Sequence, residues 1–420
     1  LVPFSFHDDC YSYDPIAGVL DAMGNNRFAA LAYFAPSTDD GNVDTSRIDD
    51  LSTRDWDQLG LAGFAAALAA GSSLRSSTVG NQANRATELA GHAIDGLAEN
   101  TKDNVYNDDA KANMATLLAN CRNELVSALG GDGGYDTIET EHKLPGGVSG
   151  EDFLNLSYRL VDNEDAVATL SASIGEWAHQ ASQVDIANNA GSPDIQMEGI
   201  ENRYQQASAA LAFLAGMADD RAETATDQKE DEVKASSDNA KLAFSVFATV
   251  ATAGLGAVGG PSGKTAMSVG TMLLAPVIAR SPKVQDVASA ASIPDLTMSV
   301  KAAAIAEAAN AGLLDPADYN EPGNHPGAFS QYGWLRPKGA DPSQSNINLA
   351  FGSNIIDDER DKSDPTDDQV ETPSQQVVHW AEMAYQETHD ERLRELTNSV
   401  IWGKSDRYVD GSTARQHGVG

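Results

Sequence analysis

The amino-acid sequence predicts a mainly α-helical fold, a multi-helix bundle with a central apolar helical hairpin and a long acidic loop region near the C-terminus. Apolar residues recur at intervals of three and four along most of the chain, which is the periodicity of a helix face. No stretch shows the sustained apolar–polar alternation of a strand, and only 6% of the residues are aromatic. With 420 residues, the chain is long enough for two or three hydrophobic cores.

The first helices are predicted within residues 14–34. Asp14 suits an N-cap, Pro15 suits the first helical position and Gly24 suits a C-cap. The apolar face of the first helix comprises Ile16, Val19, Leu20 and Met23, and a second short run buries Phe28, Leu31 and Phe34.

Helices continue through the rest of the chain. Ser149 and Asn163 are suitable N-caps for two of them, and a long helix that begins after Pro193 is expected to break near Asp219 or Ser236. One predicted helix places Cys121 on its core face. The other predicted helices cover residues 61–70, 82–99, 109–129, 283–292 and 294–311.

The predicted domain organisation has four parts. A glycine-rich stretch separates the first two, and a stretch rich in Pro, Gly, Asn and Asp makes up the third. The parts are an N-terminal helical subdomain at 1–130, a helical bundle at 149–312 that contains the apolar hairpin 242–279, an irregular acidic segment at 313–373 and a C-terminal helix at 374–404.

The apolar stretch 242–279 is the segment around which the rest is arranged. It holds one charged side chain, although the whole chain has a formal net charge of −34. Two apolar arms flank a polar, glycine-rich centre, so we expect a helical hairpin. Its tip comprises Gly259, Gly260, Pro261, Gly263 and Lys264.

Two interpretations of this hairpin remain open. In the first, the hairpin is the core of the bundle, apolar all round because other helices surround it. In the second, it inserts into a membrane, as the hairpins of colicin-type pore formers do. The arms of 17 and 15 residues are short for crossing a bilayer, which favours burial. The charged residues that bound the segment, Lys241 and Arg280, favour insertion.

The acidic composition limits the partners. Acidic residues outnumber basic ones 62 to 28, and binding to nucleic acid requires Lys and Arg to displace counterions, so we expect no nucleic-acid partner. An anionic membrane surface would repel the chain at neutral pH, and a membrane is expected as a partner only through 242–279. A halophilic origin would also explain such acidity. The two cysteines, Cys10 and Cys121, either pair or remain buried thiols.

The glycine-rich residues 254–265 resemble two nucleotide-binding patterns. Residues 254–259 spell a GxGxxG, but the preceding residues continue a helical pattern and Pro261 falls where a phosphate-binding helix would run. Residues 259–265 are similar to a P-loop, but Val258 stands where the pattern needs glycine. A nucleotide-binding enzyme is therefore a distant alternative, and close packing of helices explains the glycines better.

No other pattern predicts a catalytic, cofactor-binding or metal-binding site. His379 and His389 share a helix but are ten residues apart, not the four of a zinc-binding HExxH, so both are expected to face solvent. His92 and Glu88 have a spacing of four, which is typical of a surface contact. The expectation is a non-enzymatic protein without a cofactor.

Two short motifs stand out in residues 14–34 and 54–68. They consist of the residues at 14–24 (DPIAGVLDAMG), 28–34 (FAALAYF), 54–56 (RDW) and 59–68 (LGLAGFAAAL). These motifs resemble an uncharacterised family of helical proteins from actinobacteria that is associated with type VII (ESX/WXG-type) secretion. These are packing motifs, and the resemblance carries over no functional residue.

The resemblance implies an exported or envelope-facing helical protein of a Gram-positive bacterium. Tyr158 and Asp162 have the YxxxD spacing of type VII export signals, a pattern that also arises by chance. The sequence thus predicts a secreted or cell-envelope interaction module, with cytoplasmic location as the other possibility. Its partner would be a secretion component or a cognate small helical protein. A membrane-inserting, pore-forming toxin that uses 242–279 is the alternative.

Overall fold

The computed structural model describes residues 15–131, 143–224, 243, 247, 293–314, 373–398 and 404–414. Within these ranges the chain forms fourteen α-helices and three short 3-10 helices. The same residues contain no β-strand, and their one β-type pairing is an isolated bridge between Ser37 and Val43. The predicted mainly α fold is confirmed.

The helices follow one another closely in the N-terminal part and are longer in the middle of the chain. The α-helices are α1 (Pro15–Gly24), α2 (Arg27–Phe34), α3 (Ser46–Ser52), α4 (Gln58–Ser72), α5 (Gln82–Asn100), α6 (Asp108–Ala119), α7 (Arg122–Gly130), α8 (Gly150–Leu160), α9 (Glu164–Asn188), α10 (Pro193–Thr224), α14 (Ile293–Asn310), α15 (Pro373–Thr388), α16 (Glu391–Asn398) and α17 (Lys404–Ser412). The 3-10 helices are η1 (Ser73–Ser76), η2 (Asp103–Val105) and η5 (Pro145–Gly147).

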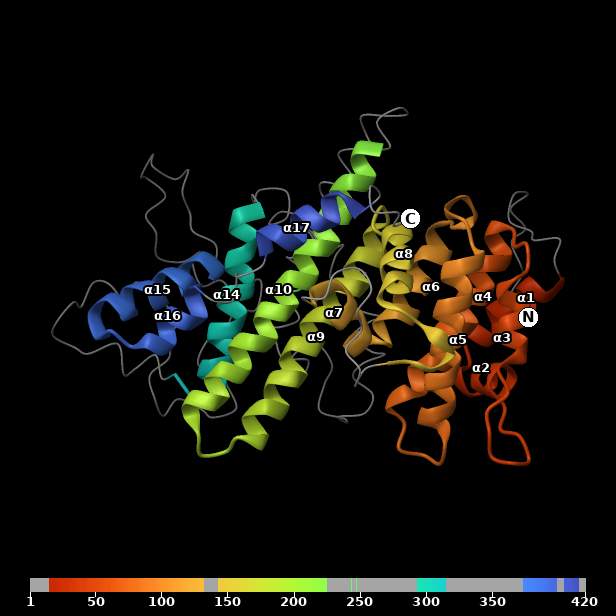
Figure 1. Ribbon diagram of the computed structural model, residues 1–420, viewed down its shortest axis with the longest axis horizontal. Helices are drawn as coiled ribbons and strands as arrows, with labels where there is room; N and C mark the ends of the chain where they lie inside the picture. Colours follow the sequence, from red (N-terminus) through yellow and green to blue (C-terminus); the bar gives the residue numbers. More distant parts are fainter. Residues whose placement is uncertain are drawn as a thin grey trace, which may run out of the picture.

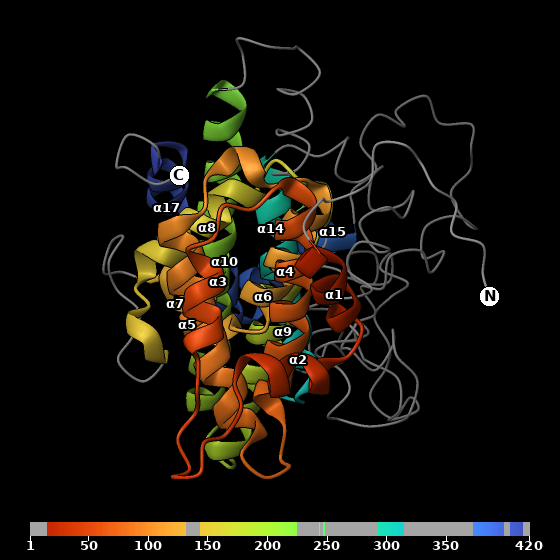
Figure 2. The same ribbon diagram turned by 90° about the vertical axis from the view of Figure 1, so that its right-hand side faces the viewer.

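Helix α10 runs through the middle of the molecule (Figure 1). The N-terminal helices α1–α6 lie toward one end of the long axis, and α14, α15 and α16 lie toward the other. Figure 2 looks at the N-terminal end, where α1, α2, α3 and α5 lie in front of the longer helices. Helices α9 and α10 pack side by side along their length and connect the two ends.

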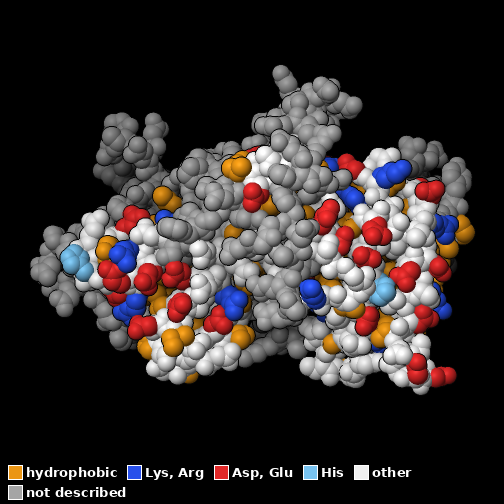
Figure 3. All heavy atoms as spheres, in the orientation of Figure 1, with side chains coloured by type: hydrophobic (Ala, Val, Ile, Leu, Met, Phe, Trp, Pro, Cys, Tyr) orange, Lys and Arg blue, Asp and Glu red, His pale blue; other side chains and the backbone are white. Residues whose placement is uncertain are grey.

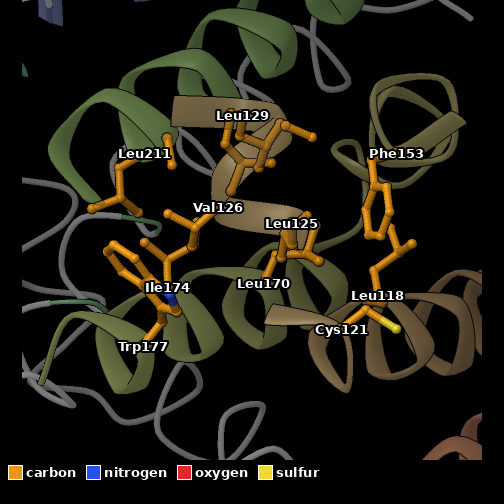
Figure 4. Packing of buried hydrophobic residues seen from close by; sticks show 14 of the residues in the cluster. Leu118, Cys121, Leu125, Val126, Leu129, Phe153, Leu170, Ile174, Trp177 and Leu211 are labelled. Carbon is orange, nitrogen blue, oxygen red and sulfur yellow. The ribbon is translucent and has the colours of Figure 1, made fainter. Parts of the chain in front are cut away.

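The hydrophobic core continues across the point where two subdomains were expected to meet. Helices α6 and α7, before the glycine-rich stretch, pack against α9 and α10, which follow it. Figure 4 shows this contact, with Leu125 and Val126 of α7 beside Leu170 and Ile174 of α9 and Leu211 of α10. All five side chains are fully buried.

The two helix starts that were predicted from their caps are confirmed. The Asn163 side chain accepts a hydrogen bond from the backbone N–H of Ala166 at 2.9 Å, at the start of α9. Ser149 and Asp152 form a reciprocal capping box at the start of α8. Both signals depend only on residues within one turn, so the local sequence was sufficient.

The helix predicted over 109–129 is two helices in the structure, α6 and α7, with the break at Asn120. The Asn120 side chain donates to the carbonyl oxygen of Ala69 at 2.9 Å and to the hydroxyl oxygen of Ser72 at 2.8 Å. These contacts with the end of α4 hold the chain where it changes direction. Cys121 lies on the core side as predicted, with no exposed surface.

The prediction of one C-terminal helix over 374–404 is wrong. The chain forms α15 and α16 there, and α17 begins at Lys404. His389 adopts a left-handed conformation with φ of 55°, which ends α15. Asp390 then accepts a hydrogen bond from the backbone N–H of Arg392 at 3.1 Å, which begins α16.

Helix α17 packs across α10, although the two are far apart in the sequence (Figure 1). The crossing is close because two glycines face the partner helix. A β-carbon built on Gly216 would lie 2.3 Å from the carbonyl oxygen of Tyr408, and one built on Gly411 would lie 2.3 Å from that of Phe213. The Tyr408 hydroxyl group also hydrogen-bonds the Asp219 carboxylate.

The tip of the predicted hairpin, Gly259, Gly260, Pro261, Gly263 and Lys264, lies outside the described residues, as does the irregular segment over 315–372. Of the hairpin's first arm, the structure describes Ala243 and Phe247. Both are helical and fully buried, and the Phe247 ring meets that of Tyr204 edge to face, with centroids 6.3 Å apart. None of the described helices has the length and apolar character needed to cross a membrane.

Candidate functional site

A polar pocket of about 170 Å³ opens between the end of α4, η1, α5 and the start of α7. Its volume is similar to that of cavities that hold a benzene-sized molecule. It is lined by Ser72, Ser73, Arg75, Ser76, Thr87, Ala119, Asn120, Arg122, Asn123 and Glu124. Nine of these ten side chains are polar or charged, so the pocket suits a small polar molecule.

Two ion pairs fix the charges around the pocket. Arg75 donates to both carboxylate oxygens of Glu124, at 2.5 and 3.2 Å, and to the carbonyl oxygen of Asn120 at 3.0 Å. Arg122 pairs with Glu176, whose side chain is completely buried behind it, at 2.8 Å. Each guanidinium thus has its own carboxylate partner.

Three potential nucleophiles in or beside the pocket, Cys121, Ser72 and Ser73, are held in unreactive states. Burial raises the pKa of the Cys121 thiol, which lies next to the pocket, to about 12, although Arg75 acts in the opposite direction. The thiol is therefore protonated at neutral pH. The Ser72 and Ser73 hydroxyls donate to the carbonyl oxygens of Ala69 and Ala70 in α4. The lining residues include no histidine that would act as a base.

The Cys121 thiol is expected to react very slowly in the folded protein. A pKa of about 12 in place of 9.0 lowers the thiolate fraction at neutral pH about a thousandfold. A Cys10→Ser variant leaves Cys121 as the single thiol, and its reaction with a chromogenic disulfide reagent is followed with and without guanidinium chloride. Fast stoichiometric reaction without denaturant would show that the thiol is accessible and ionised.

The two residues of the candidate export signal take part in tertiary contacts. Tyr158 of α8 is buried, and its hydroxyl donates to the Asp220 carboxylate of α10 at 2.8 Å. Asp162 pairs with Lys111 of α6 at 2.7 Å and with Arg221 of α10 at 3.0 Å. The Arg221 guanidinium also lies 5.5 Å from the centre of the Tyr158 ring. A protein that recognised Tyr158 would first have to displace α10.

The two N-terminal motifs form one packing unit. Helix α4, which carries the second motif, packs against α1 and α2, which carry the first. A β-carbon on Gly63 would lie 2.7 Å from the carbonyl oxygen of Ala17 in α1, so glycine permits the close approach. The Phe64 ring stacks on that of Trp56 at 5.3 Å between centroids and meets that of Phe34 at 5.7 Å. The prediction that these are packing motifs is confirmed for Leu20, Leu31 and Phe34, which are buried, whereas Val19 and Phe28 face outward.

Comparison with known families covers nearly the whole chain. Residues 3–418 match the model of a family described as a family of unknown function (DUF6571). The chain belongs to this family. No curated protein and no solved structure matches it. The DUF6571 match spans the N-terminal motifs, the polar pocket and the C-terminal helices alike.

In this DUF6571 protein, His92 and His389, two of the histidines that were considered as metal ligands, lie on different parts of the fold. The His92 ring pairs with Asp49 of α3 at 2.9 Å, so its acidic partner comes from another helix and not from Glu88. His389 is exposed, as predicted, and the side chain of His379 lies outside the described residues. Among the residues that the structure describes, no cluster of acidic, His and Cys side chains has the arrangement of a metal site.

No sequence motif indicates the polar contacts around the buried charges. Arg75 and Glu124 are 49 positions apart, and His179 and Glu307 are 128 apart, so no local spacing connects them. The signal that was available is a single acidic residue within an apolar helical stretch, as at Glu307 in the sequence KAAAIAEAAN (301–310). Such an acid is expected to be buried and paired.

Proposed function

We propose that this DUF6571 protein is a non-enzymatic helical interaction module, secreted or located in the cell envelope, that accompanies type VII secretion in actinobacteria. Its partner would be a secretion component or a cognate small helical protein. The N-terminal motifs that carry the resemblance to such proteins support the proposal, because their residues form one packed unit of α1, α2 and α4.

The observation that carries the non-enzymatic part concerns the buried charges. Among the described residues the buried charged side chains are Glu124, Arg159, Glu176, Asp220 and Glu307. Each of them bonds to a residue of another helical element. A catalytic acid or base must reach a bound substrate. These five groups instead join one helix to the next, which is a structural role.

The surface supports the same proposal. On the face shown in Figure 3, Asp and Glu side chains are spread over both ends of the described surface, with Lys and Arg side chains among them. This mixture gives no single basic stripe on that face for a phosphate backbone. A protein partner with its own basic residues would match the excess of 62 acidic over 28 basic residues in the whole chain.

Export can be tested directly. The tagged full-length protein is produced in an actinobacterium with a type VII system and in an isogenic strain that lacks the secretion ATPase. We expect the protein in the medium or envelope fraction of the first strain and in the cytosol of the second. Equal distribution in both strains would overturn the link with type VII secretion. Cross-linking in the envelope fraction, read as one discrete complex, tests the interaction role separately.

A further inference from the structure

Glu307 is the meeting point of three helices. Its side chain projects from α14 and is 3% exposed. One carboxylate oxygen lies 2.8 Å from Nδ1 of His179 on α9 and 3.4 Å from the hydroxyl of Tyr204 on α10. The other oxygen accepts a hydrogen bond from the Gln183 side chain of α9. A carboxylate this deeply buried needs such partners, because burial without them is costly.

The same contacts join the C-terminal helices to the rest of the protein. Helices α14, α15 and α16 pack mainly on one another, and α14 and α16 also contact α10 (Figure 1). Glu307 adds side-chain bonds from α14 to both His179 and Gln183 of α9. The Glu307 cluster, defined as His179, Gln183, Tyr204 and Glu307, is therefore a polar connection, within the described residues, between this three-helix unit and the α9–α10 pair.

His179 makes the connection dependent on protonation. Burial lowers the pKa of His179, but the hydrogen bond and charge of Glu307 and the charge of Glu176 raise it, and the net result is a raised pKa. Burial and Glu307 also raise the pKa of Tyr204, so this phenol remains a donor at neutral pH. The His179 ring is 29% exposed, which gives protons access from solvent.

The other charged groups near the cluster have partners of their own. Arg203 on α10, next to Tyr204, pairs with Asp185 of α9 at 2.8 Å. Burial lowers the pKa of Lys301 on α14, and the charge of Glu382 on α15 opposes this. The charges that act on His179 are those of Glu307 and Glu176, and Glu176 pairs in turn with Arg122 of α7 at 2.8 Å.

We propose that the Glu307 cluster is a pH-sensitive tie that holds α14, α15 and α16 against α9 and α10 in mild acid and loosens as the pH rises above neutral. The direction of this pH dependence follows from the raised pKa of His179. Stabilisation by the charged His179 is complete below the pKa of an unfolded histidine, about 6.5. It is lost as the pH rises through the higher pKa of the folded state. Above that point Glu307 loses its charged partner, and His179 offers at most a neutral hydrogen bond, as Gln183 and Tyr204 do.

Hydrogen exchange of the full-length protein tests the tie. Amide exchange in α14 is measured by mass spectrometry at about pH 6 and about pH 8 and corrected for the intrinsic pH dependence of exchange. We expect the protection of α14 to fall several-fold between these two values. In a His179→Gln variant, which keeps a donor but has no charge to lose, α14 protection should be low and equal at both values.

His92→Gln is the matched control, because His92 also pairs with a carboxylate but lies on α5, at the other end of the molecule. It should leave the pH dependence of α14 as in the native protein. Glu307→Gln removes the charge from the other partner and should behave as His179→Gln does. Protection of α14 that is independent of pH in the native protein, or that depends on pH equally in His179→Gln, would overturn the proposal.

Discussion

Replacing Phe64 with alanine is expected to lower the free energy of unfolding by about 3–5 kcal/mol, the usual cost of truncating a buried phenylalanine. The Phe64 side chain is fully buried and contacts the rings of Phe34 and Trp56. The cavity that it leaves would lie where α1, α2 and α4 converge, so the packing of all three helices would suffer. Chemical denaturation of the full-length protein, followed by circular dichroism, measures the change.

Val79→Ala is the control for this measurement. Val79 is 63% exposed, so its truncation should change the free energy of unfolding by no more than about 0.5 kcal/mol. An effect of Phe64→Ala as small as that of Val79→Ala would mean that the packing of the N-terminal motifs contributes little to stability.

Replacing Gly216 with alanine is expected to loosen α17 from α10. The new β-carbon would lie 2.3 Å from the carbonyl oxygen of Tyr408 and 2.7 Å from the backbone nitrogen of Ser412. Both neighbours are backbone atoms, so α17 must move as a whole. Overpacking of this kind costs about 1–3 kcal/mol. Limited proteolysis should then cut within 404–414 faster than in the native protein.

Gly18→Ala provides the comparison. Gly18 lies in α1 with no neighbouring atom within 4 Å of a built β-carbon, so alanine should fit and stabilise the helix by about 0.5–1 kcal/mol. Proteolysis within 404–414 should be unchanged in this variant. Equal protection of α17 in Gly216→Ala and in the native protein would show that the close crossing is not needed for docking.

The sequence was a good guide to features set by neighbouring residues. The caps at Ser149 and Asn163 and most of the apolar residues of the N-terminal helices lie where they were expected, but Val19 and Phe28, which were predicted on the apolar faces, are 54% and 53% exposed. Features set by contacts between distant residues were not predicted. The break at Asn120 depends on the end of α4, about 50 positions away, and the left-handed His389 has no signal of the kind that a glycine gives.

The candidate sites show the same difference between local sequence signals and contacts of distant residues. Tyr158 and Asp162 were singled out for their spacing, whereas their surroundings in the fold consist of Asp220, Arg221 and Lys111. The polar pocket and the Glu307 cluster bring together residues that are 45 to 128 positions apart. Periodicity and motif spacing do not detect such pairs. The glycine-rich tip of the hairpin lies outside the described residues, so its prediction stands as before.

Ala243 and Phe247, near the start of the apolar segment 242–279, lie inside the helical core, where Phe247 packs on Tyr204. Release of a trapped dye from phosphatidylcholine–phosphatidylglycerol vesicles tests most directly whether the segment stays in the core. The full-length protein is added at several pH values between about pH 7 and pH 4.5, because carboxylates take up protons over this range. A segment held in the core predicts no release above that of buffer at any pH. Release that grows with protein concentration, at any pH in this range, would show that the segment leaves the core and enters the bilayer.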